Sequence, residues 1–208
     1  MVYGKKKRGV GFVVSLGFFL IFCLGLVAMI VVSLLHRGTG LPVLGNPGHL
    51  VGHFSLTDQE GRTVTDAEVT GKVRVVEYFF TTCKGICPVM NAHLQRVNEA
   101  FAGDMNVVIL SHTVDPAYDN PAVMKAYAQS HGAKPGKWYF LTGSKRELYS
   151  LAINDYLLSV DSADNNIDHQ FIHTPLVALV DREGRLRGFY DATDMKEVER
   201  LIGDIKRI

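Results

Sequence analysis

The chain has 208 residues, and its 22 basic and 21 acidic side chains give a formal net charge of +1 at pH 7. This balance excludes the strongly basic surface of a typical nucleic-acid-binding domain, so we expect no nucleic-acid partner. Hydrophobic residues make up 47% of the chain and are unevenly spread, which predicts a membrane segment followed by one globular domain.

Residues 10–35 contain no charged side chain and are long enough to cross a bilayer as a helix. Four basic residues precede them within residues 1–9, and only His36 and Arg37 follow closely, so the positive-inside rule places the N-terminus in the cytoplasm. The alternative is a cleavable signal peptide, but its apolar region is usually about 7–15 residues long and ends at a small-residue cleavage site. Because no segment resembles a transit peptide, we expect a single-pass protein of the bacterial inner membrane, with its C-terminal domain on the periplasmic side.

Residues 36–48 are predicted to link the membrane segment to the globular domain at residues 49–208. The part from Gly38 to Gly48 holds two prolines and four glycines, a composition typical of linkers. Cys23 lies within the membrane segment and follows three bulky residues, which do not resemble a lipoprotein processing site. We interpret Cys23 as a small apolar residue in lipid.

The globular domain is organised around two cysteines in the stretch CKGICP at residues 83–88. This stretch follows residues 73–80, whose β-branched and aromatic side chains predict a buried strand. Pro88 favours the first turn of a helix, which we expect to run to about Phe101. The helix N-terminus would hold Cys87, with Cys83 as a second candidate, in the positive field of backbone N–H groups, where thiolates are favoured.

The three residues between Cys83 and Cys87 leave two uses of the thiols open. They permit a disulfide across the loop, and they also let two thiolates converge on one soft metal ion beside a third ligand. An outer compartment permits disulfides, so the pair can cycle between oxidised and reduced states. Two buried structural cysteines are the simplest alternative, but Gly85 between them marks a strand-to-helix turn instead of an apolar face.

The rest of the domain alternates strand-like and helix-like patterns. Strands are predicted at residues 51–57, 62–65, 106–113, 138–141, 176–180 and 185–190, and helices at residues 120–131, 144–153 and 195–205. This order predicts an α/β fold, a thioredoxin-like three-layer sandwich behind an opening hairpin. About 160 residues are enough to bury its core.

These motifs resemble the Sco/SenC family of membrane-anchored copper chaperones. The resemblance covers the anchor and the outer domain, and rests on Cys83 to Pro88, Val114-Asp115-Pro116 with Asp119 and Pro121, residues 138–143 (WYFLTG), and a late histidine. It implies a thioredoxin-like fold and delivery of copper to the copper A site of cytochrome c oxidase. The implied partners are the lipid bilayer, the copper A subunit, and a thiol reductant or other copper chaperones.

The late histidine has two candidates, His169 and His173. In the family the ligand histidine usually follows an aspartate, which favours His169 after Asp168. The family's ligand histidine also stands directly before a hydrophobic strand that ends in an Asp-x-x-Gly turn, and this position favours His173. We assign the ligand to His173, and thioredoxin-like folds imply a cis-proline at Pro175 that faces the thiols.

The resemblance therefore implies the metal ligands Cys83, Cys87 and His173. Two thiolates and an imidazole suit Cu(I), and an added ligand would suit Cu(II), whereas a structural zinc site normally has four protein ligands. His112 and Asp115 are predicted to approach these ligands, with Asp115 better supported by the family-like motif. Apart from His169 and His173, the histidines show no paired spacing and are expected on the surface or in loops. They are His36, His49, His53, His93, His112 and His131.

The alternative function is a thiol-disulfide oxidoreductase or thiol peroxidase. Cys83 would then be the nucleophile and Cys87 the resolving thiol, both redox-active, and Thr82 has a faint likeness to peroxidatic loops. His173 discriminates between the two functions, because oxidoreductase chemistry does not require it.

Overall fold

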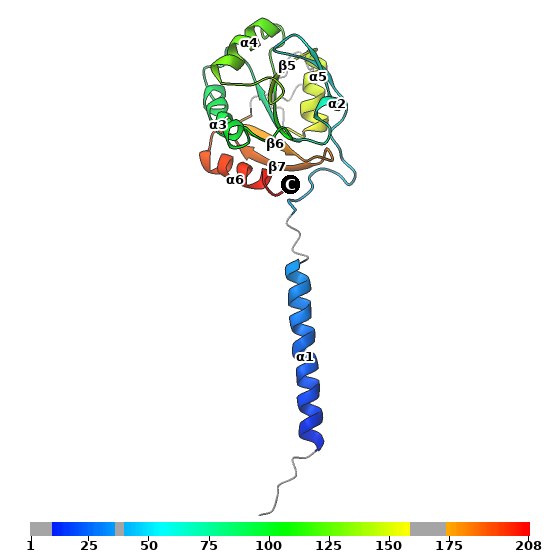
Figure 1. Cartoon of the computed structure of the whole chain (residues 1–208). Helices are drawn as coiled ribbons and strands as arrows, with labels where there is room; N and C mark the ends of the chain where they lie inside the picture. Colours follow the sequence, from blue (N-terminus) through cyan, green and yellow to red (C-terminus); the bar gives the residue numbers. More distant parts are fainter. Residues whose placement is uncertain (1–9, 36–39, 159–173) are drawn as a thin grey trace, which may run out of the picture. The chain divides into compact units, whose positions relative to one another are not determined.

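The structure, a computed structural model, describes residues 10–35, 40–158 and 174–208. The chain divides into two compact units, Met1–Thr39 and Gly40–Ile208 (Figure 1). In the first unit, the helix α1 spans Val10–Leu35, the range expected from the sequence. Its stretch Val14–Val32 is long and apolar enough to cross a membrane.

The second unit, Gly40–Ile208, is the outer unit of the predicted topology, and it is built on one mixed sheet. Among the described residues, its seven strands follow the order β2-β1-β5-β4-β3-β6-β7. Neighbouring strands pair in parallel from β3 to β4 and from β4 to β5, and antiparallel elsewhere. The strands are β1 (Ser55–Asp58), β2 (Thr63–Thr65), β3 (Val73–Phe79), β4 (Val107–Thr113), β5 (Trp138–Thr142), β6 (Leu176–Val180) and β7 (Leu186–Asp191).

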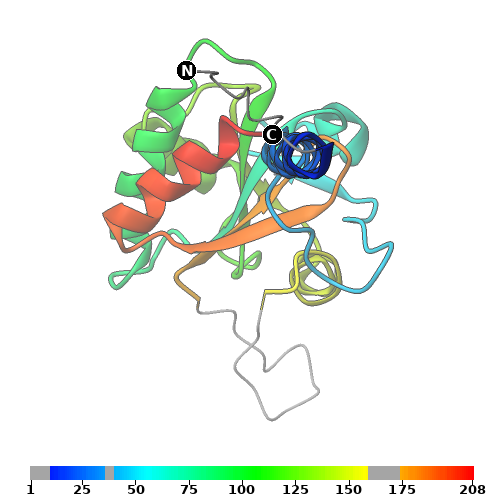
Figure 2. The ribbon, with the colours of Figure 1, turned by 90° about the horizontal axis from the view of Figure 1, so that it is seen from below.

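Helices cover both faces of the sheet and make a three-layer sandwich. One apolar core contains side chains of α3 (Cys87–Ala100), α4 (Pro121–Ser130) and α6 (Met195–Ile205). The other contains side chains of α2 (Asp66–Val69), α5 (Lys145–Ser150) and the π-helix η1 (Leu151–Asp155). Figure 2 shows α3 and α6 on one side of the sheet and α5 on the other.

The buried strands β3 and β4 explain why their sequence is apolar without alternation. On β3, Val75 and Phe79 face the core under α3, while Val76 and Tyr78 face the core under α5. A strand buried on both faces needs apolar side chains at successive positions. The helix predicted at residues 144–153 is confirmed only in its first part, because it changes to a π-helix at Leu151.

Part of the segment expected as a linker lies against the outer unit. The amide of Leu44 donates to the carbonyl of Leu186 at 2.9 Å, and Leu44 packs against the core under α5. The guanidinium of Arg187 donates to the carbonyls of Leu41 and Pro42. The segment from Leu41 onward is therefore bound to β7. Its carbonyls accept hydrogen bonds from Arg187, and Leu44 adds an apolar side chain to the core.

The expected cis-proline is wrong. The described residues contain no cis peptide bond, and these include both Thr174 and Pro175. The carbonyl of Pro175 accepts from the amide of Ala192 at 2.8 Å, beside the first pair of the β6–β7 ladder. This extended approach to β6 suits the trans bond, which is favoured by about 0.5–1 kcal/mol even before proline.

Candidate metal and redox site

The two cysteines lie where β3 and β4 end. Cys83 stands in the loop after β3, and Cys87 is the first residue of α3, with Pro88 in the first turn as predicted. Because β3 and β4 run parallel, their carboxyl ends meet at the same edge of the sheet. The predicted position of the thiols is confirmed.

Both cysteines are free, and each thiol shifts the pKa of the other, so the two sulfurs interact. Partial burial acts to raise the pKa of Cys83, but the Cys87 thiol and the amides of Gly85, Ile86 and Cys87 donate to its sulfur and lower its pKa overall. Burial, together with the bond to Cys83, raises the pKa of Cys87 to about 12. The expectation that the helix N-terminus favours a thiolate at Cys87 is therefore wrong, because burial raises the pKa of that thiol, whereas Cys83, the second candidate, has the lowered pKa.

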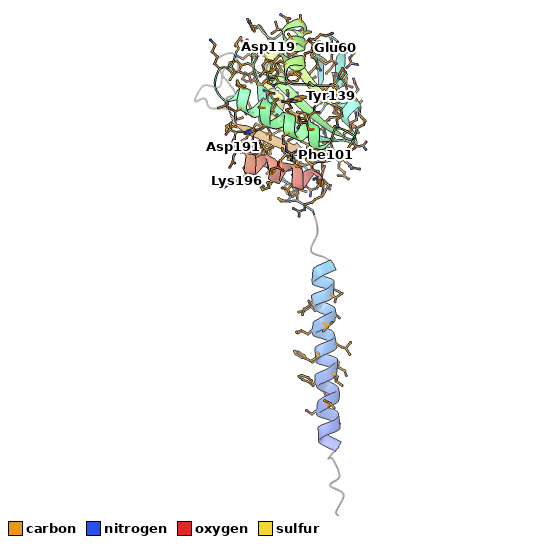
Figure 3. All side chains as sticks on the ribbon, turned by 60° about the vertical axis from the view of Figure 1, so that its left-hand side comes forward. Glu60, Phe101, Asp119, Tyr139, Asp191 and Lys196 are labelled. Carbon is orange, nitrogen blue, oxygen red and sulfur yellow. The ribbon has the colours of Figure 1, made fainter. Side chains whose placement is uncertain are left out.

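Asp119 fastens the loop that carries Cys83. Its buried carboxylate accepts from the amide of Thr81 at 3.2 Å and from the hydroxyls of Thr81 and Thr113. Thr81 lies two residues before Cys83, and Thr113 is the last residue of β4. Asp119, labelled in Figure 3, therefore ties the cysteine loop to the neighbouring strand.

The sequence predicted that Asp115 approaches the ligands, whereas the side-chain contacts to the cysteine loop come from Asp119. The amide of Asp115 donates to the hydroxyl of Thr113 at 3.0 Å, and its carbonyl accepts from the amide of Asp119 at 2.9 Å. In the described part of the chain these contacts of Asp115 are made by its backbone. The family-like motif contained both aspartates, so the signal for Asp119 was present in the sequence.

A buried carboxyl group lies on the same face of the sheet as α3. Glu77 on β3 is fully buried and accepts a bond from the hydroxyl of Ser111, which in turn accepts from the indole N–H of Trp138 at 2.8 Å. Burial raises the pKa of Glu77 to about 7, although the Ser111 bond opposes this shift. Glu77 also contributes to the raised pKa of Cys87, so the two groups interact. The only sequence signal was one acidic residue inside an apolar strand.

Polar contacts with Asn91 and Tyr127 fix the first turn of α3. The side-chain amide of Asn91 donates to the carbonyl of Cys87 at 3.0 Å and to the hydroxyl of Tyr127 at 3.1 Å. The Tyr127 ring stacks on Phe79 with 5.4 Å between ring centroids. These contacts connect the start of α3 with α4 and the end of β3.

His112 does not approach the thiols, so its predicted role is wrong. Strand alternation turns it to the opposite face of the sheet, where its ring stacks on Tyr78 with 5.1 Å between centroids. It is fully buried, not at the surface, and neither ring nitrogen has a hydrogen-bond partner among the described residues. Burial lowers the pKa of His112 to about 4.

His169 and His173 lie outside the described residues, so the structure does not place the expected third ligand. Within the described ranges, no group of three or more His, Cys, Asp and Glu side chains could hold a metal ion. The described donors are therefore the two thiols. Their softness and mutual contact fit a soft cation such as Cu(I), with a further ligand supplied from elsewhere.

Comparison with known proteins agrees with this arrangement. A family model described as SCO1/SenC matches residues 44–208. The SCO1 protein homolog of Bacillus subtilis (strain 168) is 29% identical over 155 residues, which cover 74% of this chain and 79% of that protein.

Two solved structures are similar in fold and in sequence. Bradyrhizobium japonicum ScoI with copper bound is 29% identical with a TM-score of 0.60, and the match covers 76% of this chain and 98% of that one. BsSco is a member of the Sco family of cytochrome c oxidase assembly proteins in which a disulfide switch was identified. It is 27% identical with a TM-score of 0.65, covering 80% of this chain and 95% of that one. These likenesses confirm the predicted thioredoxin-like α/β fold, and the chain belongs to the SCO1/SenC family.

Proposed function

We propose that this protein is a membrane-anchored copper chaperone that delivers copper to the copper A site of a cytochrome c oxidase. The observation that carries the proposal is the pair of free, interacting thiols at the carboxyl ends of β3 and β4. A relative of the same fold binds copper, and another belongs to the cytochrome c oxidase assembly proteins. Copper is the cargo, so a site open at Cys83 suits both loading and release.

The proposed ligands are Cys83, Cys87 and His173. The strand β6 pairs antiparallel with β3, with Val76 opposite Ala178, so β6 begins at the end of the sheet where β3 ends. Thr174, the residue after His173, therefore approaches the sheet from the side of the thiols. This direction supports an imidazole ligand from residue 173. Two thiolates and one imidazole would supply soft donors for Cu(I), and an added ligand would serve Cu(II).

The thiols also support a redox contribution. Cys83 and Cys87 would form a disulfide when oxidised, as the disulfide switch of BsSco suggests, and copper binding would then need a thiol reductant. Reduction of cysteines in the oxidase subunit would use the same pair. A thiol-disulfide oxidoreductase or thiol peroxidase without copper is the alternative function, which a metal measurement separates from delivery.

The proposal predicts about one copper ion per reduced chain. In a copper-competition titration of the full chain in detergent, Cys83→Ser and Cys87→Ser should nearly abolish binding, because a soft ion loses half of its thiolate donors. His173→Ala should bind at least tenfold more weakly, about 1.4 kcal/mol for each factor of ten, and still form the disulfide.

The matched control is His169→Ala, four residues earlier, which should bind copper as the parent does. Full affinity in either serine variant would refute the shared site. Loss of affinity in the His169 variant but not in the His173 variant would assign the ligand to His169. Parent-like behaviour of both histidine variants would remove the third ligand and favour the oxidoreductase, as would a parent that binds no copper.

A further inference from the structure

A second site-like feature lies at the opposite end of the sheet from the thiols. A surface pocket of about 330 Å³ lies beside the start of β3 and the turn between β6 and β7. Its polar and charged lining includes Arg74 of β3, Arg182 and Glu183 of the turn, and His53 and Asp66. Its volume is in the range of small-molecule sites.

Arg74 is buried and forms no ion pair with any residue that the structure describes. Its side chain is part of a residue only 4% exposed, and no carboxylate among the described residues forms an ion pair with it. Among the described residues, its side chain has one hydrogen bond, a long one of 3.4 Å from Nη2 to the carbonyl of Asp181, and its Nε has no partner there. Buried arginines are normally paired, because an uncompensated buried charge is costly.

The other buried arginine of the domain shows the usual arrangement. Arg187, 8% exposed, forms an ion pair with Asp181 at 2.7 Å and donates to the carbonyls of Pro42 and Leu41. It therefore has a carboxylate and two carbonyls, whereas Arg74 has one distant carbonyl. The comparison of these two arginines indicates that Arg74 has room for a partner, and that this partner is not among the described residues.

The carboxylates around the pocket are already engaged. Asp66 accepts from His53 at 2.7 Å, and Glu183 accepts from Arg185 at 2.8 Å. Burial lowers the pKa of Arg74, while Tyr156, Asp181 and Asp66 oppose the shift, and a guanidinium stays charged in proteins in any case. Arg182 is exposed and has no ion pair within the described ranges. The two unpaired charges at the pocket are therefore both cations.

We propose that this pocket binds a phosphate group, held by Arg74 at its floor and by Arg182 at its rim. A phosphate monoester or inorganic phosphate carries a charge of about −1.5 to −2 at pH 7, which matches two unpaired guanidinium groups. Arginine presents a fork of N–H donors that fits phosphate oxygens, and Arg74 lines the pocket with only one long hydrogen bond from its guanidinium to the described chain. The site is separate from the thiols, so the inference goes beyond copper delivery and does not depend on it.

The test is the thermal unfolding of the full chain in neutral detergent, with inorganic phosphate as the probe and chloride at equal ionic strength as reference. Fluorescence of Trp138, the only tryptophan, reports unfolding of the outer unit. The unfolding midpoint should rise with phosphate concentration and saturate, because a ligand that binds only the folded state stabilises it. Arg74→Met should weaken the apparent affinity at least tenfold, and Arg182→Gln several-fold.

Two comparisons separate binding from structural damage. Because Arg74 has no ion-pair partner in the part of the chain that the structure describes, Arg74→Met without phosphate should unfold at the parent temperature or above it. Arg96→Gln removes an exposed arginine that is paired with Glu199 on the helical face, and should respond to phosphate as the parent does. If Arg74→Met does not fold, the exposed Arg182→Glu, which reverses a charge, replaces it and should abolish the response. A parent that responds no more to phosphate than to chloride, or an Arg74 or Arg182→Glu variant that responds like the parent, would overturn the proposal.

Discussion

At the scale of single residues, a few buried polar groups decide the geometry around the thiols. Asp119 is fully buried and bonds to Thr81 and Thr113 through both of its carboxylate oxygens. Hydrogen bonds to a charged group are worth about 1.5–3 kcal/mol each, so this carboxylate is the strongest fixed link between the cysteine loop and β4. Removal of this carboxylate should therefore loosen the position of Cys83, two residues beyond Thr81.

Asp119→Asn should lower both the free energy of unfolding and the affinity for copper. The amide NH₂ cannot accept a bond from Thr81 or Thr113, so at least one charge-assisted bond is lost, at a cost of about 2 kcal/mol. Chemical denaturation measures the stability, and copper competition measures the affinity.

The control for this variant is Asp115→Asn, which changes an aspartate of the same loop whose described contacts are made by the backbone. It should behave as the parent in both measurements. Parent-like stability and copper affinity in Asp119→Asn would show that the loop is held by other contacts.

At the scale of the elements, β3 and β4 carry ionisable side chains into both cores. Glu77 and Ser111 face the α3 side, and His112 faces the α5 side. Burial favours the neutral form of each group, so it raises the pKa of Glu77 to about 7 and lowers that of His112 to about 4. The two groups lower the free energy of unfolding at opposite ends of the pH range. The contribution of neutral His112 is lost as the pH falls from 6.5 toward 4, and that of neutral Glu77 is lost as the pH rises from 4.5 through 7.

We predict that the free energy of unfolding of Glu77→Gln falls less than that of the parent as the pH rises to neutral and above. The pKa of Glu77 is raised from 4.5 to about 7 on folding, so its neutral form contributes fully below pH 4.5 and this contribution is lost as the pH rises through 7. The shift corresponds to a loss of about 3 kcal/mol in the free energy of unfolding between pH 4.5 and pH 8.

Denaturant unfolding of the reduced protein at several pH values, followed by Trp138 fluorescence, tests this prediction. Glutamine does not titrate, so the variant should lose about 3 kcal/mol less than the parent over this range. Glu99→Gln, a change at an exposed position of α3, should keep the parent profile. An unchanged pH profile in Glu77→Gln would mean that the buried carboxyl is compensated in the folded state.

At the scale of the whole molecule, the chain combines an apolar helix with a separate compact unit. The helix α1 is apolar on all sides, and its described side chains are exposed or half-exposed within the chain, which suits contact with lipid. The basic residues before it predict an N-terminus in the cytoplasm and an outer unit on the periplasmic side of the bacterial inner membrane.

Protease added to spheroplasts should therefore digest the outer unit and leave a small membrane-bound fragment. Inverted vesicles provide the opposite arrangement and should protect the outer unit. Protection of the whole chain in spheroplasts would contradict the orientation. Release of an undigested soluble domain without protease would identify residues 10–35 as a signal peptide.

The sequence by itself determined the long apolar helix at residues 10–35, the strand–helix order and the position of the two cysteines. These features depend on local physics: an uncharged stretch of bilayer length, side-chain periodicity, and a proline that starts a helix. The tertiary structure decided what local patterns do not contain. The register of β4 turned His112 away from the thiols, and the burial of Cys87 made Cys83 the more acidic thiol. Packing on β7 bound Leu41 and Leu44 to the outer unit, and the fold buried Arg74 away from any ion-pair partner in the described ranges, because face, burial and partner are set only when distant segments meet.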